Sequence, residues 1–200
     1  MQLRVNMRET RALVAASYVL AACLLNACET LPPASIAPAE NTSIATRFTL
    51  TGRLSIRSGE RLDSVKLVWL KDQREERLQF FTPFGSQVAE VSQVDGGTAI
   101  LRQGREVITA ESLGTLTESF LGVALDTDEI GKWVQGVGLD EGESRDLRLR
   151  DGSTWRVTAE RMQTATALNR PGDIFRYAAR LTAVKGDITI RLVVDEWQAL

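Results

Sequence analysis

The sequence predicts a mainly β fold with inserted helices (α+β). The expected architecture is an incomplete antiparallel β-barrel of about ten strands, in which two short helices cover a hydrophobic cavity. Three observations lead to this prediction. Apolar residues alternate with polar ones in many segments, short glycine-containing turns separate these segments, and the spacing becomes helical between Glu111 and Gly138.

The first expected strand shows the alternation clearly. From Thr46 to Arg57, Phe48, Leu50, Leu54 and Ile56 fall on one side, and threonine, arginine and serine fall on the other. The same pattern predicts strands at 64–71, 76–81, 87–94, 98–103, 106–110, 146–150, 154–161, 174–184 and 187–197.

Short turns join many of these strands, which makes neighbouring strands antiparallel. Gly96-Gly97, Gly104-Arg105, Asp151-Gly152 and Gly186-Asp187 are of the hairpin-closing type. The helical segment holds Leu113, Leu116, Phe120 and Leu121, and then Ile130, Trp133 and Val134 after a break at 122–127. Asp126 or Thr127 is expected to cap the second helix, and Gly136 or Gly138 to end it.

The inside of such a barrel is either filled by side chains or left as a cavity, and the sequence alone does not distinguish the two. The residues expected to face inward are Phe48, Leu54, Ile56, Val65, Leu67, Trp69, Leu78, Phe80, Trp155, Val157, Phe175, Tyr177, Leu181, Ile188, Ile190 and Leu192.

The N-terminal region has the features of a lipoprotein signal. Three arginines precede the run "ALVAASYVLAACLLNA", sixteen residues without a charge, which is short for a membrane span of about twenty residues. Cys28 follows Leu25-Asn26-Ala27, which resembles a bacterial lipobox despite the atypical Asn26, and Cys23 is an alternative site. Cys28 is favoured because a flexible Pro/Ala/Ser segment follows it. The expected parts are a signal peptide at 1–27, a lipidated Cys28 with its tether at 28–45, and a folded domain at 46–200. A plain secretory signal or an uncleaved anchor is the other interpretation.

Composition argues against several classes of function. The chain has zero histidines, so a Ser-His-Asp triad is impossible, and both cysteines lie near the N-terminus. We therefore expect no enzyme, no metal and no cofactor. The formal charge of −2, without a basic cluster, gives no footprint for nucleic acid. The carboxylates around the helices, from Asp126 to Glu143, are interpreted as solvated charge.

The stretch "FFTPFG" (80–85) places an aromatic residue in a turn. Pro83, Phe84 and Gly85 have the composition of a solvent-exposed turn, so Phe84 either folds back on Phe80 or Phe81 or projects into solvent.

The chain resembles the LolB family of outer-membrane lipoproteins. The matching stretches are "FTLTGRLSIR" (48–57), "VWLK" with Trp69, "TPFGSQ" (82–87), "KWVQG" (132–136), "GSTWRV" (152–157) and a last strand that ends in Trp197. The resemblance implies a monomeric receptor, anchored by its N-terminal lipid at the periplasmic face of the outer membrane. Such a receptor accepts acylated lipoproteins from the periplasmic carrier LolA and inserts them among the outer-membrane lipids.

The resemblance also implies roles for particular residues. Phe84 stands where the family projects an apolar residue towards the membrane. Glu29 follows the lipidated cysteine, at a position where an acidic residue, chiefly aspartate, favours retention in the inner membrane of some bacteria. The candidates for the acyl-chain cavity are Phe48, Leu54, Ile56, Leu67, Trp69, Phe80, Leu113, Leu116, Phe120, Trp133, Trp155, Tyr177 and Leu181.

Two other functions stay open from the sequence. One is a lipid-anchored binding module for a free amphiphile, such as a phospholipid or a glycolipid. The other is a structural envelope lipoprotein, which predicts a filled barrel and an exposed apolar patch. If the carrier is acidic, Arg102, Arg105, Arg148 and Arg150 are its expected contacts near the mouth.

Overall fold

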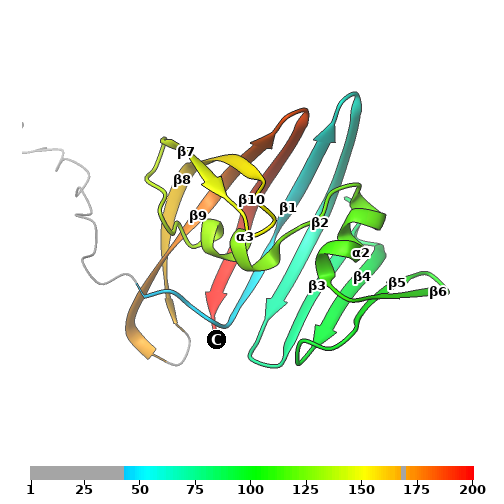
Figure 1. Cartoon of the computed structure of the whole chain (residues 1–200). Coiled ribbons are helices and arrows are strands. Elements are labelled where there is room, and N and C mark those ends of the chain that lie inside the picture. The colour runs from blue at the N-terminus through cyan, green and yellow to red at the C-terminus, as the bar shows by residue number, and fades with distance from the viewer. Residues whose placement is uncertain (1–42, 168–169) are drawn as a thin grey trace, which may run out of the picture. The chain divides into compact units, whose positions relative to one another are not determined.

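The computed structural model describes residues 43–167 and 170–200, which form one antiparallel sheet of ten strands with two helices on one face (Figure 1). The strands are β1 Phe48–Ser58, β2 Arg61–Lys71, β3 Glu75–Phe81, β4 Gln87–Val94, β5 Ala99–Gln103, β6 Glu106–Ala110, β7 Ser144–Arg148, β8 Thr154–Ala167, β9 Arg170–Lys185 and β10 Ile188–Ala199. The helices are α2 Leu113–Leu121 and α3 Thr127–Val134.

The first and last strands meet in the middle of the sheet, whose order is β6-β5-β4-β3-β2-β1-β10-β9-β8-β7. β1 pairs with β10 from Phe48 opposite Ala199 to Ser58 opposite Ile188. β6 and β7 are the two edges, and within the described residues they do not pair with each other, so the sheet stays open. The predicted incomplete barrel of ten strands and two helices is confirmed.

One face of the sheet and the two helices form a single apolar core. The burial pattern of β1 alternates as the sequence predicts, with Leu50 and Leu54 buried and the outward residues accessible. α2 lies against β4, β5 and β6, whereas α3 lies against β9, so the helices cover different parts of the same face (Figure 1). Burial of these apolar surfaces is the main contribution to stability.

Side-chain caps fix the starts of both helices, and backbone hydrogen bonds close their ends. The Ser112 side chain accepts a hydrogen bond from the amide of Thr115 at the start of α2, and Gly122 ends that helix with a φ of 76°. Asp126 caps α3 by accepting from the amide of Glu129, and Gly136, at a φ of 68°, follows the C-cap Gln135. The prediction of Asp126 as a cap is confirmed.

Some boundaries differ from those expected. β7 ends at Arg148 because a turn begins at Leu149, whose amide donates to Ser153. β8 runs on to Ala167, with register shifts that interrupt the period-two pattern. Within the described residues, neither helix is both long and apolar enough to cross a bilayer. Cys23 and Cys28 lie outside the described residues.

Candidate functional site: the apolar interior beneath α3

The interior holds a small apolar cavity of about 20 Å³ where α3 meets the inner face of the sheet. About 10 to 15 Å³ of such space is enough for one water molecule, so the cavity has room for about one. The interior is therefore close to the filled alternative. The residues that line it are Leu54, Leu67, Trp69, Leu78, Leu125, Thr127, Ile130, Trp133, Leu181, Ala183, Ile190 and Leu192.

The structure brings the predicted cavity residues into one cluster. Leu54, Leu67, Trp69, Trp133 and Leu181 line the cavity itself. The other candidates belong to the surrounding core, either buried or packed against it: Phe48, Ile56, Phe80, Leu113, Leu116, Phe120, Trp155 and Tyr177. Of the remaining lining residues, Leu125 and Ala183 carry no signal in the sequence, because one lies in a loop and the other is small.

Aromatic pairs connect the helices to the sheet. The Phe120 ring of α2 lies 5.3 Å from that of Phe80 on β3, and Trp133 of α3 lies 6.4 Å from Trp155 on β8. Beside α3, Phe48 and Trp69 make an edge-to-face pair at 5.0 Å. These are ordinary core contacts, and apolar surface of the same kind suits an acyl chain.

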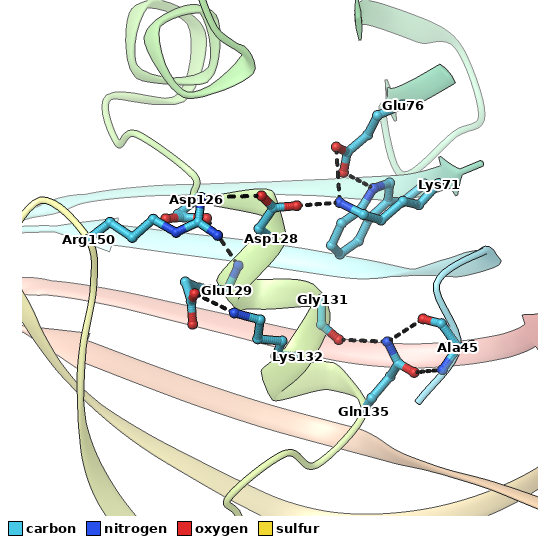
Figure 2. Close-up of polar contacts among 11 residues, drawn as sticks. Ala45, Lys71, Glu76, Asp126, Asp128, Glu129, Gly131, Lys132, Gln135 and Arg150 are labelled. Atoms are coloured by element: carbon cyan, nitrogen blue, oxygen red, sulfur yellow. Dashed lines mark hydrogen bonds and ion pairs between the residues drawn. The ribbon is translucent and has the colours of Figure 1, made fainter. Parts of the chain in front are cut away.

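A polar cluster, which we call the α3 latch, joins the start of α3 to β2. Lys71 Nζ lies 2.8 Å from Asp128 Oδ1 on α3 and 3.2 Å from Glu76 Oε2 on β3 (Figure 2). Glu76 also accepts a hydrogen bond from the Trp69 indole at 2.9 Å. Arg150, after β7, lies 3.9 Å from Asp128. The latch therefore ties α3 to β2 and β3 and to the turn that follows β7.

The latch shifts the pKa of its central pair. Burial lowers the pKa of Lys71, but the hydrogen bond to Asp128 and the charge of Glu76 outweigh it, so this pKa lies above its usual value. The hydrogen bond from Lys71 holds the pKa of Asp128 below its usual value despite partial burial. Both groups are therefore charged at neutral pH.

A second polar contact, the Gln135 clasp, joins the end of α3 to the segment that leads into β1. Gln135 is 8% exposed, and its side chain accepts from the Ala45 amide at 2.6 Å and donates to the Ala45 carbonyl at 3.0 Å (Figure 2). The same nitrogen also donates to the Gly131 carbonyl at 3.2 Å. A cleft of about 270 Å³ opens between this segment, α3 and the latch. α3 is thus held at both ends.

The turn between β3 and β4 presents Phe84 to solvent. The Thr82 amide donates to Ser86 at 2.8 Å, the Gly85 amide donates to Thr82 at 2.9 Å, and Gly85 has a φ of 91°. With the turn fixed in this way, Phe84 is 98% exposed. The structure therefore has the projecting arrangement and not the one folded back on Phe80 or Phe81.

The carboxylates around the helices have structural partners. Asp126 caps α3, Asp128 belongs to the latch, and Glu129 pairs with Lys132 at 2.7 Å. Asp140 pairs with Arg145 at 2.8 Å. Within residues 43–167 and 170–200, no three acidic, histidine or cysteine side chains gather in a way that could hold a metal ion.

Fold and site together define a class of protein: an open antiparallel sheet that wraps an apolar interior beneath two helices. A family model described as "Outer membrane lipoprotein LolB" matches residues 46–197. The chain therefore belongs to the LolB family of outer-membrane lipoproteins, which places it at the outer membrane.

Two relatives agree in extent with this assignment. The chain is 26% identical to the outer-membrane lipoprotein LolB of Azoarcus sp. (strain BH72), with 97% of this chain and 100% of the relative covered. It is 24% identical to that of Shewanella oneidensis, with 88% and 85% covered. A DUF1329 family protein from Desulfovibrio piger is similar in structure, with a TM-score of 0.48 and 8% identity over 78% of this chain and 86% of that one.

Proposed function

We propose that this protein is a lipid-anchored receptor that accepts lipoproteins from the periplasmic carrier LolA by their acyl chains and inserts them into the outer membrane. The observation that carries the proposal is the apolar inner face of the sheet beneath two helices, in a member of the LolB family. In this proposal Cys28, or Cys23 as the alternative, carries the anchor, and residues 28–45 form the tether. The receptor acts as a monomer by binding, without catalysis.

Acyl chains need such a shelter because their exposure to water is costly. At about 0.8 kcal/mol per methylene, a chain of about fourteen methylenes contributes on the order of 11 kcal/mol when it leaves water. Because the cavity of about 20 Å³ is far too small for such a chain, α3 and α2 must move away from the sheet during uptake. The chain then occupies the surface that Leu54, Trp69 and Leu181 line.

Release into the membrane is the second half of the proposed function, and Phe84 assists it. A phenylalanine that is almost fully exposed at the tip of a turn gains about 1.5 to 3 kcal/mol on burial in the interfacial region. Pro83 and Gly85 hold the turn in the shape that projects Phe84. This energy orients a tethered protein but does not anchor it.

The test is transfer of cargo. The chain from Glu29 onward is mixed with LolA loaded with an acylated lipoprotein, and movement of the cargo is followed by co-purification. Transfer of the acylated cargo, and not of the same cargo without acyl chains, is the expected result. Equal transfer of both forms, or of neither, would contradict the proposal.

The filled interior favours a second candidate, a structural envelope lipoprotein. The same experiment separates the two, because a scaffold takes up neither acylated cargo nor free lipid. Uptake of free phospholipid or glycolipid without any transfer from LolA would instead indicate the binding module for free amphiphiles.

A further inference from the structure

The β1–β2 hairpin extends well past its neighbour β3. β2 pairs with β3 only from Lys66 opposite Phe81 onward, whereas β2 pairs with β1 as far as Arg61 opposite Ser58. Residues 58–65 therefore extend beyond the end of β3, and the hairpin rises above it in Figure 1. Since β2 and β3 are antiparallel, this projecting hairpin lies at the same end of the strands as the turn that carries Phe84.

The outer face of this end, opposite the helices, carries exposed apolar side chains. Leu62 is 54% exposed and pairs across the hairpin with Arg57. Arg57 pairs on its other side with Thr189, and Thr189 pairs with Val184, which is 36% exposed. Arg57 therefore stands between two accessible aliphatic side chains on one face.

The charges around Leu62 on this face are positive, and the acids of the face, Asp146, Glu160 and Asp195, lie further along it, where they pair with Arg156, Arg180 and Arg53. Arg57, Lys66 and Arg191 face outward, and the other outward positions between them are Ser55, Ser64 and Thr189. Within the described residues, neither Arg57 nor Lys66 takes part in an ion pair. The acids of this end lie elsewhere: Glu60 and Asp187 are in the turns, and Asp63, opposite the buried Ile56, pairs with Arg61 at 2.7 Å.

We propose that this outer face, which we call the hairpin patch, docks on an anionic phospholipid surface. An exposed aliphatic side chain flanked by long cationic side chains suits a membrane interface, because the aliphatic group enters the interfacial region while the cations reach lipid phosphates. The inference rests on the proposed function, in which Phe84, at the same end of the strands, contacts the same membrane. The patch adds the lipid class that the protein prefers.

The test uses the processed, lipidated protein in vesicles. A single cysteine replaces Leu62 and carries an environment-sensitive fluorophore, and the unmodified protein controls for labelling elsewhere. In vesicles with about one quarter anionic phospholipid, we expect a blue shift of the emission and quenching by spin-labelled lipids. Arg57→Gln or Lys66→Gln should each lower the ratio of docked to undocked protein about fivefold.

Two matched controls lie at the opposite end of the sheet. Val94, at 55%, is as exposed as Leu62, but because it lies at the far end the Val94→Cys label should show no lipid contact. Arg74→Gln should leave the signal at position 62 unchanged. An equal signal in purely zwitterionic vesicles would overturn the preference for anionic lipid. A signal at position 62 that appears only when LolA is added would assign the patch to the carrier.

The outcome also separates this inference from the proposed function. If acylated cargo still moves from LolA to the protein while the label at position 62 never meets lipid, the hairpin patch is refuted and the receptor function stands. If the label meets anionic lipid but no cargo is accepted, the membrane contact stands and the receptor function is refuted.

Discussion

Removal of the Gln135 clasp should free α3 from the sheet without unfolding the protein. Gln135→Ala leaves both the amide and the carbonyl of Ala45 without their partner, and Ala45 is itself buried. An unsatisfied buried group costs about 1 to 3 kcal/mol. Water from the adjacent cleft can reach these groups, so we take the lower part of that range for each, about 2 to 3 kcal/mol in all. The opening equilibrium of α3 should shift about 30- to 150-fold.

Hydrogen exchange measures this opening directly. Peptides that cover Thr127–Val134 should exchange faster in Gln135→Ala by that factor, whereas peptides from β3 and β4 should be unchanged. Gln93→Ala is the control. The Gln93 side chain, like that of Gln135, donates to a backbone carbonyl, that of Gly97 at 2.6 Å, but this contact lies on the exposed surface. Its effect should stay near twofold, the level of an ordinary surface substitution.

Two results would refute the reasoning. If α3 exchanges at the same rate in Gln135→Ala as in the parent protein, the clasp does not hold the helix. If α3 and the strands speed up together, the helix does not open on its own, and uptake of acyl chains by movement of α3 loses its basis.

Four further predictions concern the latch, the helix and the turn. Asp128→Asn should speed hydrogen exchange of α3 only about two- to fivefold, because the ion pair with Lys71 is partly exposed. Glu129→Gln, which spares the latch, should have a smaller effect. Equal effects of the two substitutions would contradict the role of the latch. The latch should stop stabilising α3 as the pH falls through the depressed pKa of Asp128, and again as the pH rises through the raised pKa of Lys71. The exchange rate of α3, corrected for the intrinsic rate of each amide, should therefore be constant from about pH 5 to 9. Gly131→Ala should stabilise the protein by about 0.5 to 1 kcal/mol and slow cargo uptake, because the added methyl group fits at 3.5 Å from its nearest neighbour; a lower melting temperature would contradict this. Phe84→Glu should leave acceptance of cargo intact and slow its insertion into vesicles, and equal loss of both steps would count against a membrane role for Phe84.

The sequence predicts the fold well because the fold depends on local pattern. Alternation gives each strand its inward face, and short glycine turns make the neighbours antiparallel. The prediction weakens where the pattern is interrupted. β8 was expected to end at Arg161, but the register shifts between Ala159 and Met162 move its side chains out of strict alternation. The Ser112 cap was not predicted, although serine is one of the preferred residues at the N-cap of a helix.

The site is less accessible to prediction because its polar contacts join distant parts of the chain. Lys71 and Asp128 are 57 residues apart, and Ala45 and Gln135 are 90 apart. No local pattern connects such pairs, so Asp128 reads in the sequence as solvated charge. The apolar lining, by contrast, follows from which face of each strand is buried. The sequence can therefore predict what the interior is made of, but not how α3 is fastened over it.

The filled interior and the proposed uptake of acyl chains are compatible because helix and cargo compete for the same surface. Opening costs the Gln135 clasp, about 2 to 3 kcal/mol, and the latch, about 1 kcal/mol. The apolar face of α3, with Trp133 and Val134, need not enter water, because it can lie on the acyl chain instead of on the sheet. A chain left in water would cost on the order of 11 kcal/mol, so an open receptor that shelters the chain is favoured over its exposure by more than the cost of both contacts. A closed, packed interior is thus the expected resting state of such a receptor, in which α3 opens transiently and stays open only when an acyl chain takes its place.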